Sequence, residues 1–303
     1  MPKVTVLLST YNGEKYISEQ LDSLLAQQEA DVRVLIRDDS STDGTCRIIE
    51  SFRAAHPGRI AVMSGSHKGF SGSFFSLVRE AASSDDSDYY AFCDQDDVWV
   101  PDRLQAAISM IDSDSPVPEM YFSNATLTDS KLKPVRSLYD NFSFPPLKSM
   151  RLTDNPAAGC TIVFNKKARD CFVLADENKI VYHDFWMYLI CSYLGRVVYD
   201  DRCGVLYRQH EDNVMGRLDK KKVWINRAKK MKHRLHLREY SASELSRLFS
   251  DKIDPSETEN INIMAGYRQN LSTRMRLLFH REIVAPSADK NFWFKLQVIL
   301  GSA

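Results

Sequence analysis

The strongest constraint on the fold is a repeated alternation of short apolar runs and amphipathic helical stretches in the first 115 residues. The run Val4–Ser9 is continuously apolar, which is typical of a strand buried on both faces. A helical stretch over 13–27 follows, in which apolar residues recur on one face. The same unit then repeats, with strands expected at 32–36, 60–63 and 89–93, helices at 42–55 and 101–111, and a turn at Gly69–Ser73 that leads into a helix through Ala82. This alternation predicts an α/β fold built on a mostly parallel, doubly wound sheet.

The pattern changes twice further along the chain. Strands are expected at 121–128, 159–164, 196–199 and 204–208, and helices near 166–175 and from 183. After Gly216 the composition becomes that of long charged helices, and Asp254–Glu257 carries an N-cap, a first-turn proline and a first-turn acid. We therefore divide the chain into 1–216, with halves of about 1–115 and 116–216, and a basic helical C-terminal region over 217–303.

Charge is balanced overall but not along the chain. The 40 basic and 40 acidic residues give zero net charge, which argues against a nucleic-acid partner. From Arg217 to Arg238, however, ten Lys or Arg residues accompany one acid, and Trp224, Met231 and Leu235 share one helical face. Such a basic amphipathic helix either lies on an anionic membrane or packs on the rest of the protein. Both interpretations stay open, as does a homodimer formed through these tail helices.

Cysteine usage and hydropathy indicate the compartment. The six cysteines are scattered, without a CxxC pair or a zinc-type spacing, which suits reduced thiols. No stretch approaches the ~20 apolar residues that span a bilayer. The first apolar run is too short for a signal peptide. We expect a cytoplasmic protein, with peripheral contact to the inner face of the cell membrane as the further option.

Polar clusters follow three of the predicted strands. They are Thr10-Tyr11-Asn12, Asp38-Asp39-Ser40 and Asp94-Gln95-Asp96-Asp97. Ligands of doubly wound sheets bind beyond the carboxyl ends of the strands, where these clusters fall. The coincidence predicts one ligand site formed by all three loops.

The third cluster points to a divalent cation. Carboxylates on one tight turn repel one another unless a cation or hydrogen-bond donors compensate. Mg²⁺ and Mn²⁺ are hard ions that prefer oxygen ligands. The alternative is that the dipole of the helix after Pro101 stabilises an acid cluster at the N-terminus of that helix. The segment 68–72, with its two glycines, also has two interpretations. Its N–H groups could face a phosphate, but ordinary turn chemistry explains the glycines more simply.

At this point the chain resembles a known family. The segments Ser9–Gly13, Asp38–Thr45 and Asp94–Asp97, in this order and spacing, resemble inverting family 2 glycosyltransferases. Further on, Gly159-Cys160-Thr161, His183-Asp184-x-Trp186 and Tyr207-Arg208-Gln209-His210-x-x-Asn213 resemble, more narrowly, bacterial rhamnosyltransferases of that family. The resemblance covers about residues 3–216 and implies a GT-A type catalytic domain with a C-terminal helical extension. The first half would hold the nucleotide sugar and the second half the acceptor.

The resemblance also implies roles for single residues. The nucleotide-sugar pocket would be formed by Thr10, Tyr11, Asn12, Glu14, Asp39, Gly69, Asp94 and Gln95. Within it Asp39 would contact the base, and Asp94 the ribose or the outer shell of the metal. Asp96 would bind Mg²⁺ or Mn²⁺ at the diphosphate, with His210 as a second ligand or a diphosphate contact. A purely structural histidine is the alternative for His210.

The resemblance places the chemistry on the second half. Asp184 would be the general base of an inverting transfer, and an N-cap aspartate is the alternative. The acceptor and sugar pocket would be lined by Gly159, Cys160, His183 and Trp186.

The expected activity is therefore transfer of a sugar from a nucleotide diphosphate to a glycan or lipid-linked acceptor, in bacterial surface polysaccharide synthesis. The preferred donor is dTDP-rhamnose, with a UDP-sugar as the other option. Two competing functions are a sugar nucleotidyltransferase and a non-catalytic glycan- or nucleotide-sugar-binding protein. A nucleotidyltransferase would carry a basic, glycine-rich segment after the first strand, unlike Thr10–Glu14. A non-catalytic protein would not need Asp39, Asp94, Asp96 and Asp184 together.

Overall fold

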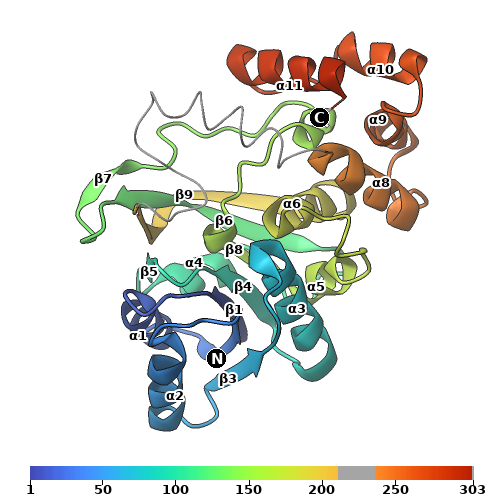
Figure 1. The fold of residues 1–303 in the computed structure, drawn as a ribbon. Helices are drawn as coiled ribbons and strands as arrows, with labels where there is room; N and C mark the ends of the chain where they lie inside the picture. The colour runs from blue at the N-terminus through green and yellow to red at the C-terminus, as the bar shows by residue number, and fades with distance from the viewer. Residues whose placement is uncertain (211–235, 302–303) are drawn as a thin grey trace.

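One twisted sheet runs through the computed structural model, which describes residues 1–210 and 236–301 (Figure 1). Its strand order is β3-β2-β1-β4-β8-β6-β9-β5, and β7 pairs with β6 outside this path. The first half is formed by β1 (Lys3–Thr10), β2 (Asp31–Asp38), β3 (Ile60–Ser64) and β4 (Tyr89–Cys93). All neighbours within this half are parallel, as the alternation predicts.

The second half makes the sheet mixed. It contains β5 (Val98–Trp99), β6 (Glu119–Thr128), β7 (Pro134–Ser137), β8 (Ile162–Asn165) and β9 (Arg196–Arg208). Strand β8 runs antiparallel to both β4 and β6, whereas β6 and β9 are parallel. The predicted strands 196–199 and 204–208 are one strand, β9, whose register against β6 shifts between them. The α/β fold class is confirmed, and the parallel part is confined mainly to the first half.

Helices cover both faces of the sheet. On one face lie α1 (Ile17–Leu25), α2 (Thr45–Ala55) and α4 (Arg103–Ile108); on the other lie α3 (Gly69–Ser84), α5 (Lys166–Phe172) and α6 (His183–Leu194). Successive side chains of a strand point to opposite faces. Accordingly Leu7 packs under α3 and α6, while Val6 and Leu8 pack under α1 and α2. This alternation is why the strands read as unbroken apolar runs.

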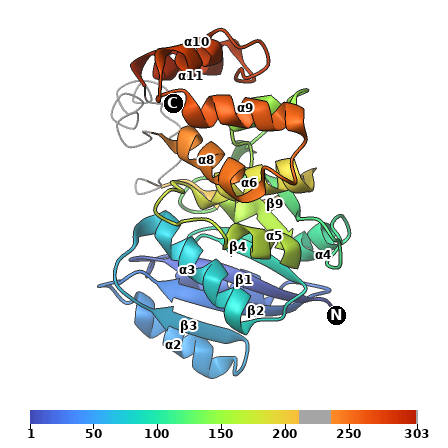
Figure 2. The same cartoon turned by 90° about the vertical axis from the view of Figure 1, so that its right-hand side faces the viewer.

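The C-terminal helices stack outside α6 (Figure 2). They are α8 (Leu237–Phe249), α9 (Pro255–Gly266), α10 (Leu271–Leu278) and α11 (Ala288–Leu300), and short 3₁₀ turns occur at Lys148–Leu152 and Gly159–Thr161. The predicted start of α9 is confirmed, because the Asp254 side chain accepts from the Ser256 N–H and Pro255 opens the helix. None of the helices in the described ranges is long and apolar enough to cross a membrane.

One predicted helix starts later than expected, and two further predictions fall outside the described residues. The first helix begins at Ile17 rather than at 13, because Gly13 donates its N–H to the Thr45 hydroxyl and Glu14 to the Asp43 carboxylate. Asn213 and the apolar stripe over 224–235 lie outside the described residues.

A buried carboxylate fastens α8 to the segment between α5 and α6. Glu244 has a side chain that is 0% exposed, and it accepts from Lys179, Arg247 and the Asp176 N–H at 2.6–3.1 Å. Burial alone would raise its pKa. The three sets of hydrogen bonds outweigh burial, and the pKa of Glu244 falls from 4.5 to about 2. The ionised form therefore stabilises the folded state.

We predict that Glu244→Gln lowers the free energy of unfolding at neutral pH by about 1–3 kcal/mol, because charge-assisted hydrogen bonds are lost and donors stay unpaired. Since the folded-state pKa of Glu244 is depressed, its contribution is present above about pH 4.5 and fades toward pH 2. Urea denaturation across this range should show the difference between variant and wild type shrinking as pH falls. Glu259→Gln, which removes an exposed pair with Arg276, is the control and should change little. A Glu244→Gln difference that does not depend on pH would contradict the electrostatic explanation.

Candidate active site

The strand registers bring the three polar loops together. Thr10 of β1 lies level with Asp38 of β2, and Leu8 of β1 lies level with Cys93 of β4. The segments that follow these strands therefore start at the same edge of the sheet. The predicted convergence of 10–12, 38–40 and 94–97 is confirmed.

Gln95 links the first and third loops directly. Its Oε1 accepts from the Thr10 hydroxyl at 2.7 Å and from the Tyr11 N–H at 2.8 Å, and its Nε2 donates to the Tyr11 carbonyl at 3.1 Å. The amide thus uses both its acceptor and its donor to fix one turn of backbone. Gln95 sets the position of Tyr11.

Asn12 and Glu14 link the first loop to the second. Asn12 adopts a positive φ of 49°, and its Oδ1 accepts from the Thr42 N–H at 2.8 Å. The Glu14 carboxylate accepts from the Gly44 N–H at 2.8 Å, at the start of α2. These contacts hold the loops against each other, so Glu14 has a supporting role at the pocket edge.

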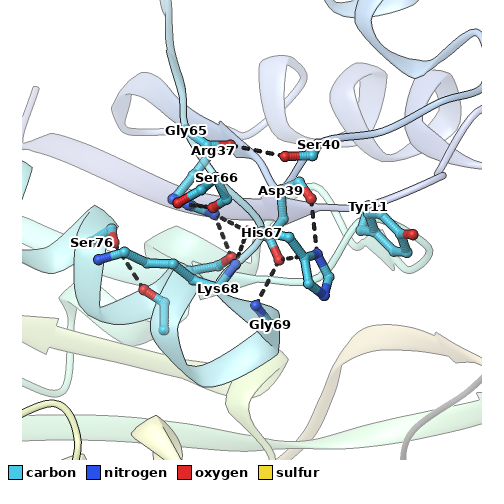
Figure 3. A network of polar contacts seen from close by, with 12 residues as sticks. Tyr11, Arg37, Asp39, Ser40, Gly65, Ser66, His67, Lys68, Gly69 and Ser76 are labelled. Atoms are coloured by element: carbon cyan, nitrogen blue, oxygen red, sulfur yellow. Dashed lines mark hydrogen bonds and ion pairs between the residues drawn. The ribbon is translucent and has the colours of Figure 1, made fainter.

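Asp39 is the centre of a buried polar network (Figure 3). Its Oδ1 accepts from Arg37 and from the Lys68 N–H, and its Oδ2 accepts from the Gly69 N–H at 2.8 Å and lies 2.9 Å from His67 Nδ1. Burial would raise its pKa, but the hydrogen bonds from Lys68, Arg37 and Gly69 outweigh burial and hold the pKa below its usual value. Asp39 is therefore an anion that fixes the 65–69 loop.

This network changes two of the expected roles. The Asp39 side chain is only 3% exposed, so it offers almost no surface to a base. The Gly69 N–H points at Asp39 rather than at a phosphate, and the positive φ of 72° that this turn needs explains the glycine. Sequence reasoning missed Arg37 and His67, which carry no motif of their own.

The acid cluster lies at the end of β4. Asp96 Oδ2 is 2.7 Å from His210 Nε2, so the structure brings together the two predicted metal ligands. Ligand atoms of Asp94, Asp97 and Cys160 lie within 4.8 Å of one another, on the buried side of the same turn. Burial, with the charges of Asp96 and then Asp184, raises the pKa of Asp94 to about 8.

Arg208 holds this turn in place from β9. Its backbone N–H donates to Asp97 at 3.0 Å, and its guanidinium donates to the Asp96 carbonyl at 2.8 Å and pairs with Glu19 of α1. Even so, Asp97 Oδ2 is buried with no hydrogen-bond partner among the described residues. The oxygen-rich donor set, its net negative charge and this unsatisfied oxygen fit a hard divalent cation.

Asp184 lies near the acid cluster from the other half of the sheet. It sits in the first turn of α6, whose N-cap is Tyr182, so the N-cap alternative for Asp184 is wrong. Gly159 packs closely here, because a Cβ at this position would lie 3.0 Å from His183 Nε2 and 3.7 Å from Asp184 Cβ. A side chain at 159 would therefore crowd the His183 ring and come into contact with Asp184.

Three of the four expected pocket residues belong to the core. Trp186 is 0% exposed, stacks near Phe249 and donates its indole N–H to the Phe172 carbonyl at 3.2 Å. His183 is equally buried, stacked 3.9 Å from Phe74, and burial lowers its pKa to about 3. Cys160 is 2% exposed beside Asp97. In this structure these side chains support Asp184 and the acid cluster from beneath and present no surface to a sugar.

The first half of the sheet is parallel and carries polar loops and an aspartate cluster at its carboxyl edge. The second half places Asp184 near that cluster. This is the architecture of a nucleotide-sugar glycosyltransferase. The model of glycosyl transferase family 2 matches residues 5–171, and the chain belongs to this family.

Relatives and solved structures agree with this assignment. The chain is 29% identical over 231 residues to the dTDP-rhamnosyl transferase RfbG of Shigella flexneri, covering 69% of this chain and 73% of that protein. It is 31% identical over 112 residues to a putative glycosyltransferase, EpsE, of Bacillus subtilis, covering 37% of this chain and 39% of that protein.

Two solved structures share the fold. They are S. aureus TarS 1-349, with a TM-score of 0.55 at 15% identity over 99% of this chain and 81% of that one, and the mannosyltransferase PcManGT of Pyrobaculum calidifontis, also at 0.55, with 14% identity over 99% and 80%. The latter was solved with GDP-Man and Mn²⁺. The expected GT-A fold is confirmed.

Proposed function

We propose that this enzyme transfers L-rhamnose from dTDP-rhamnose, with inversion, to a glycan or lipid-linked acceptor in bacterial surface polysaccharide synthesis. The observation that carries the reaction type is the position of Asp184 beside the acid cluster: a Cβ at Gly159 would lie 3.7 Å from Asp184 Cβ, and the next residue, Cys160, has its ligand atom within 4.8 Å of those of Asp94 and Asp97. The general base and the diphosphate-binding residues would then lie on either side of the reacting sugar. The likeness to the dTDP-rhamnosyl transferase supports the donor.

Asp184 would take the proton in a single displacement. The acceptor oxygen forms a bond to the anomeric carbon while the bond from that carbon to the diphosphate oxygen breaks. The leaving diphosphate keeps the bonding electrons, and the acceptor's proton passes to an Asp184 oxygen. Gly159 leaves room beside this carboxylate. Buried His183 and Trp186 hold the first turn of α6 rigid beneath it.

Asp96 and His210 would hold Mg²⁺ or Mn²⁺, with Asp94 nearby. Such an ion supplies counter-charge to the diphosphate and makes it a better leaving group. The PcManGT structure with GDP-Man and Mn²⁺ supports this choice of cation. The TarS structures with UDP and with UDP-GlcNAc support a nucleotide-sugar ligand.

We predict that Asp96→Ala lowers transfer by more than about 100-fold, equivalent to about 2.7 kcal/mol in the barrier, because the diphosphate loses its counter-charge. Initial rates with and without Mn²⁺ measure this effect, and circular dichroism checks the fold. Asp102→Ala, an exposed acid just after the same turn, is the control and should retain activity. Full turnover of the wild type in excess chelator would refute the metal assignment.

A second prediction concerns Asp184→Asn. The amide cannot accept the proton, so turnover should fall by about 10²–10⁴-fold. Isothermal titration with dTDP should show affinity that is not weakened, because Asp184 would act on the acceptor and the substitution removes a negative charge near the diphosphate site. Asp289→Asn removes a first-turn aspartate from α11 and controls for helix-dipole effects. Weaker nucleotide binding at an unchanged rate for bound substrate would make Asp184 structural.

We further propose that the enzyme works in the cytoplasm, at the inner face of the membrane. Residues 217–238 carry ten basic residues and one acid. Each basic residue near an anionic surface contributes ~1 kcal/mol of attraction.

The protein should therefore co-sediment with phosphatidylserine-containing vesicles and be released as salt rises. Neutral vesicles are the matched control. Equal binding to both kinds of vesicle, or to neither, would assign the basic segment to packing instead.

A further inference from the structure

The last two helices, α10 and α11, form the end of the molecule farthest from β1, β2 and β3 (Figure 1 and Figure 2). They lie side by side there and pack inward through buried apolar residues, which are Leu277 of α10 and Phe294 and Val298 of α11. Arg238 of α8 fixes the inner side of α11, because it donates to Gln297 at 3.0 Å and its guanidinium carbon lies 5.6 Å from the centroid of the Phe294 ring. The inward sides of both helices are therefore already occupied.

The outward sides of these helices are apolar as well. Apolar residues recur at i, i+4, i+7 and i+8 on both helices, a spacing that gathers them on one face. In α10 and its C-cap they are Leu271, Met275, Leu278 and Phe279, and in α11 they are Phe292, Leu296, Ile299 and Leu300. At 3.6 residues per turn, each set is centred on the side away from Leu277 or Phe294. We call the two sets together the α10–α11 face.

Most of this face is open to solvent. Leu278 and Leu296 are half-buried, and the other members of the face are exposed. The two aromatic members are the clearest cases, since Phe279 is 70% exposed and Phe292 is 63% exposed. The other exposed large apolar side chains of the described residues stand singly along the chain, which is ordinary for a protein surface. Their concentration between 271 and 300 marks an interaction surface.

The charges around the face are mainly positive. The segment 271–300 contains the cations Arg274, Arg276, Arg281, Lys290 and Lys295 and the acids Glu282 and Asp289, a net charge of +3. Arg276 pairs with Glu259, and Lys290 pairs with Asp154. Among the described residues the other three cations form no ion pair. Lys295 lies three residues after Phe292 and four before Ile299, so it borders the apolar face directly.

These charges decide which partner fits. In a two-fold dimer through this face, the same positively charged surface would meet itself, and like charges oppose such contact. Anionic headgroups would instead attract it. Helices that lie in a membrane interface bury apolar side chains at the boundary between headgroups and acyl chains and keep Lys and Arg beside them. Trp293, whose ring centroid lies 5.7 Å from that of Phe292, is a residue type enriched at this depth.

We propose that the α10–α11 face docks on an anionic lipid surface. Phe279 and Phe292, with the aliphatic members of the face, enter the boundary between headgroups and acyl chains, while Arg281 and Lys295 meet the headgroups. This inference goes beyond the proposed transfer reaction. It also differs from the attraction proposed for the basic residues of 217–238, because the contact is apolar and is made by other residues.

The test is co-sedimentation with vesicles of phosphatidylcholine and phosphatidylserine, comparing the wild type with the double variant Phe279→Ser/Phe292→Ser. Because removing a phenylalanine from water contributes about tenfold or more to partition, the double variant should bind about 10- to 100-fold more weakly. Salt screens the attraction between charges but not the burial of apolar side chains. The ratio between wild type and variant should therefore persist as salt rises, even as both bind less.

Two further variants serve as controls. Phe279→Leu/Phe292→Leu keeps the face apolar and should retain most of the binding. Leu174→Ser removes an apolar side chain that is 54% exposed just after α5, and it should bind like the wild type. Thermal melting should be unchanged in all of them, since the substituted side chains are exposed. Donor hydrolysis should also be unchanged, because none of these residues belongs to the candidate active site.

The outcomes separate this inference from the proposed function. If the double variant binds vesicles like the wild type, the face is not the docking surface, although the basic residues could still attract the protein to lipid. A wild-type dimer that the double substitution dissociates, with vesicle binding unchanged in sedimentation experiments, would assign the face to a second copy and overturn the inference. A wild type that hydrolyses a donor but binds no vesicles would overturn it and leave the transfer reaction standing. Folded protein that hydrolyses no donor, yet loses vesicle binding on the double substitution, would do the reverse.

Discussion

The mutual repulsion of carboxylates at one sheet edge is the constraint on which the rest of the site depends. Asp94, Asp96 and Asp97 share a single turn, and Asp184 faces them from α6. The chain compensates only in part. Arg208 binds the turn from outside. The buried Arg103 guanidinium, 3.5 Å from the centroid of the Trp99 ring, interacts electrostatically with Asp97. Burial still raises the pKa of Asp97 well above its usual value, with Asp96 and Asp94 adding to the effect. A divalent cation at this edge would relieve the repulsion and favour the ionised carboxylates.

A second buried carboxylate, Asp39, has the opposite balance. Four donors saturate it, and its pKa is lowered despite burial. It therefore fixes the 65–69 loop and the ring of His67. Along one sheet edge, one anionic centre is thus left short of positive charge and the other is fully satisfied.

Much of this arrangement could be predicted from the sequence, and the limits have physical causes. Parallel strands with polar residues at their ends fix the location of a site, so the meeting of Thr10, Asp39 and Asp96 was predictable. The pairing of Asp96 with His210 followed only from the family resemblance. The burial of Trp186 and His183 could not be predicted from the motif. Both lie in the first turn of α6, and nearly all side chains of α6 are buried against its neighbours. The partners of Asp39 also escaped prediction, since Arg37 lies within a strand and His67 is 28 residues away in a turn of ordinary composition.

The account is tested most directly by measuring donor hydrolysis across dTDP-rhamnose, UDP-sugars and GDP-sugars, with Mn²⁺, with Mg²⁺ and in chelator. Slow hydrolysis uses the same nucleotide pocket, cation and leaving group as transfer but needs no knowledge of the acceptor. The account predicts that dTDP-rhamnose is hydrolysed fastest, that a UDP-sugar is second, and that chelator abolishes both reactions. Folded protein that hydrolyses none of these donors with either metal, or that prefers a GDP-sugar, would contradict it.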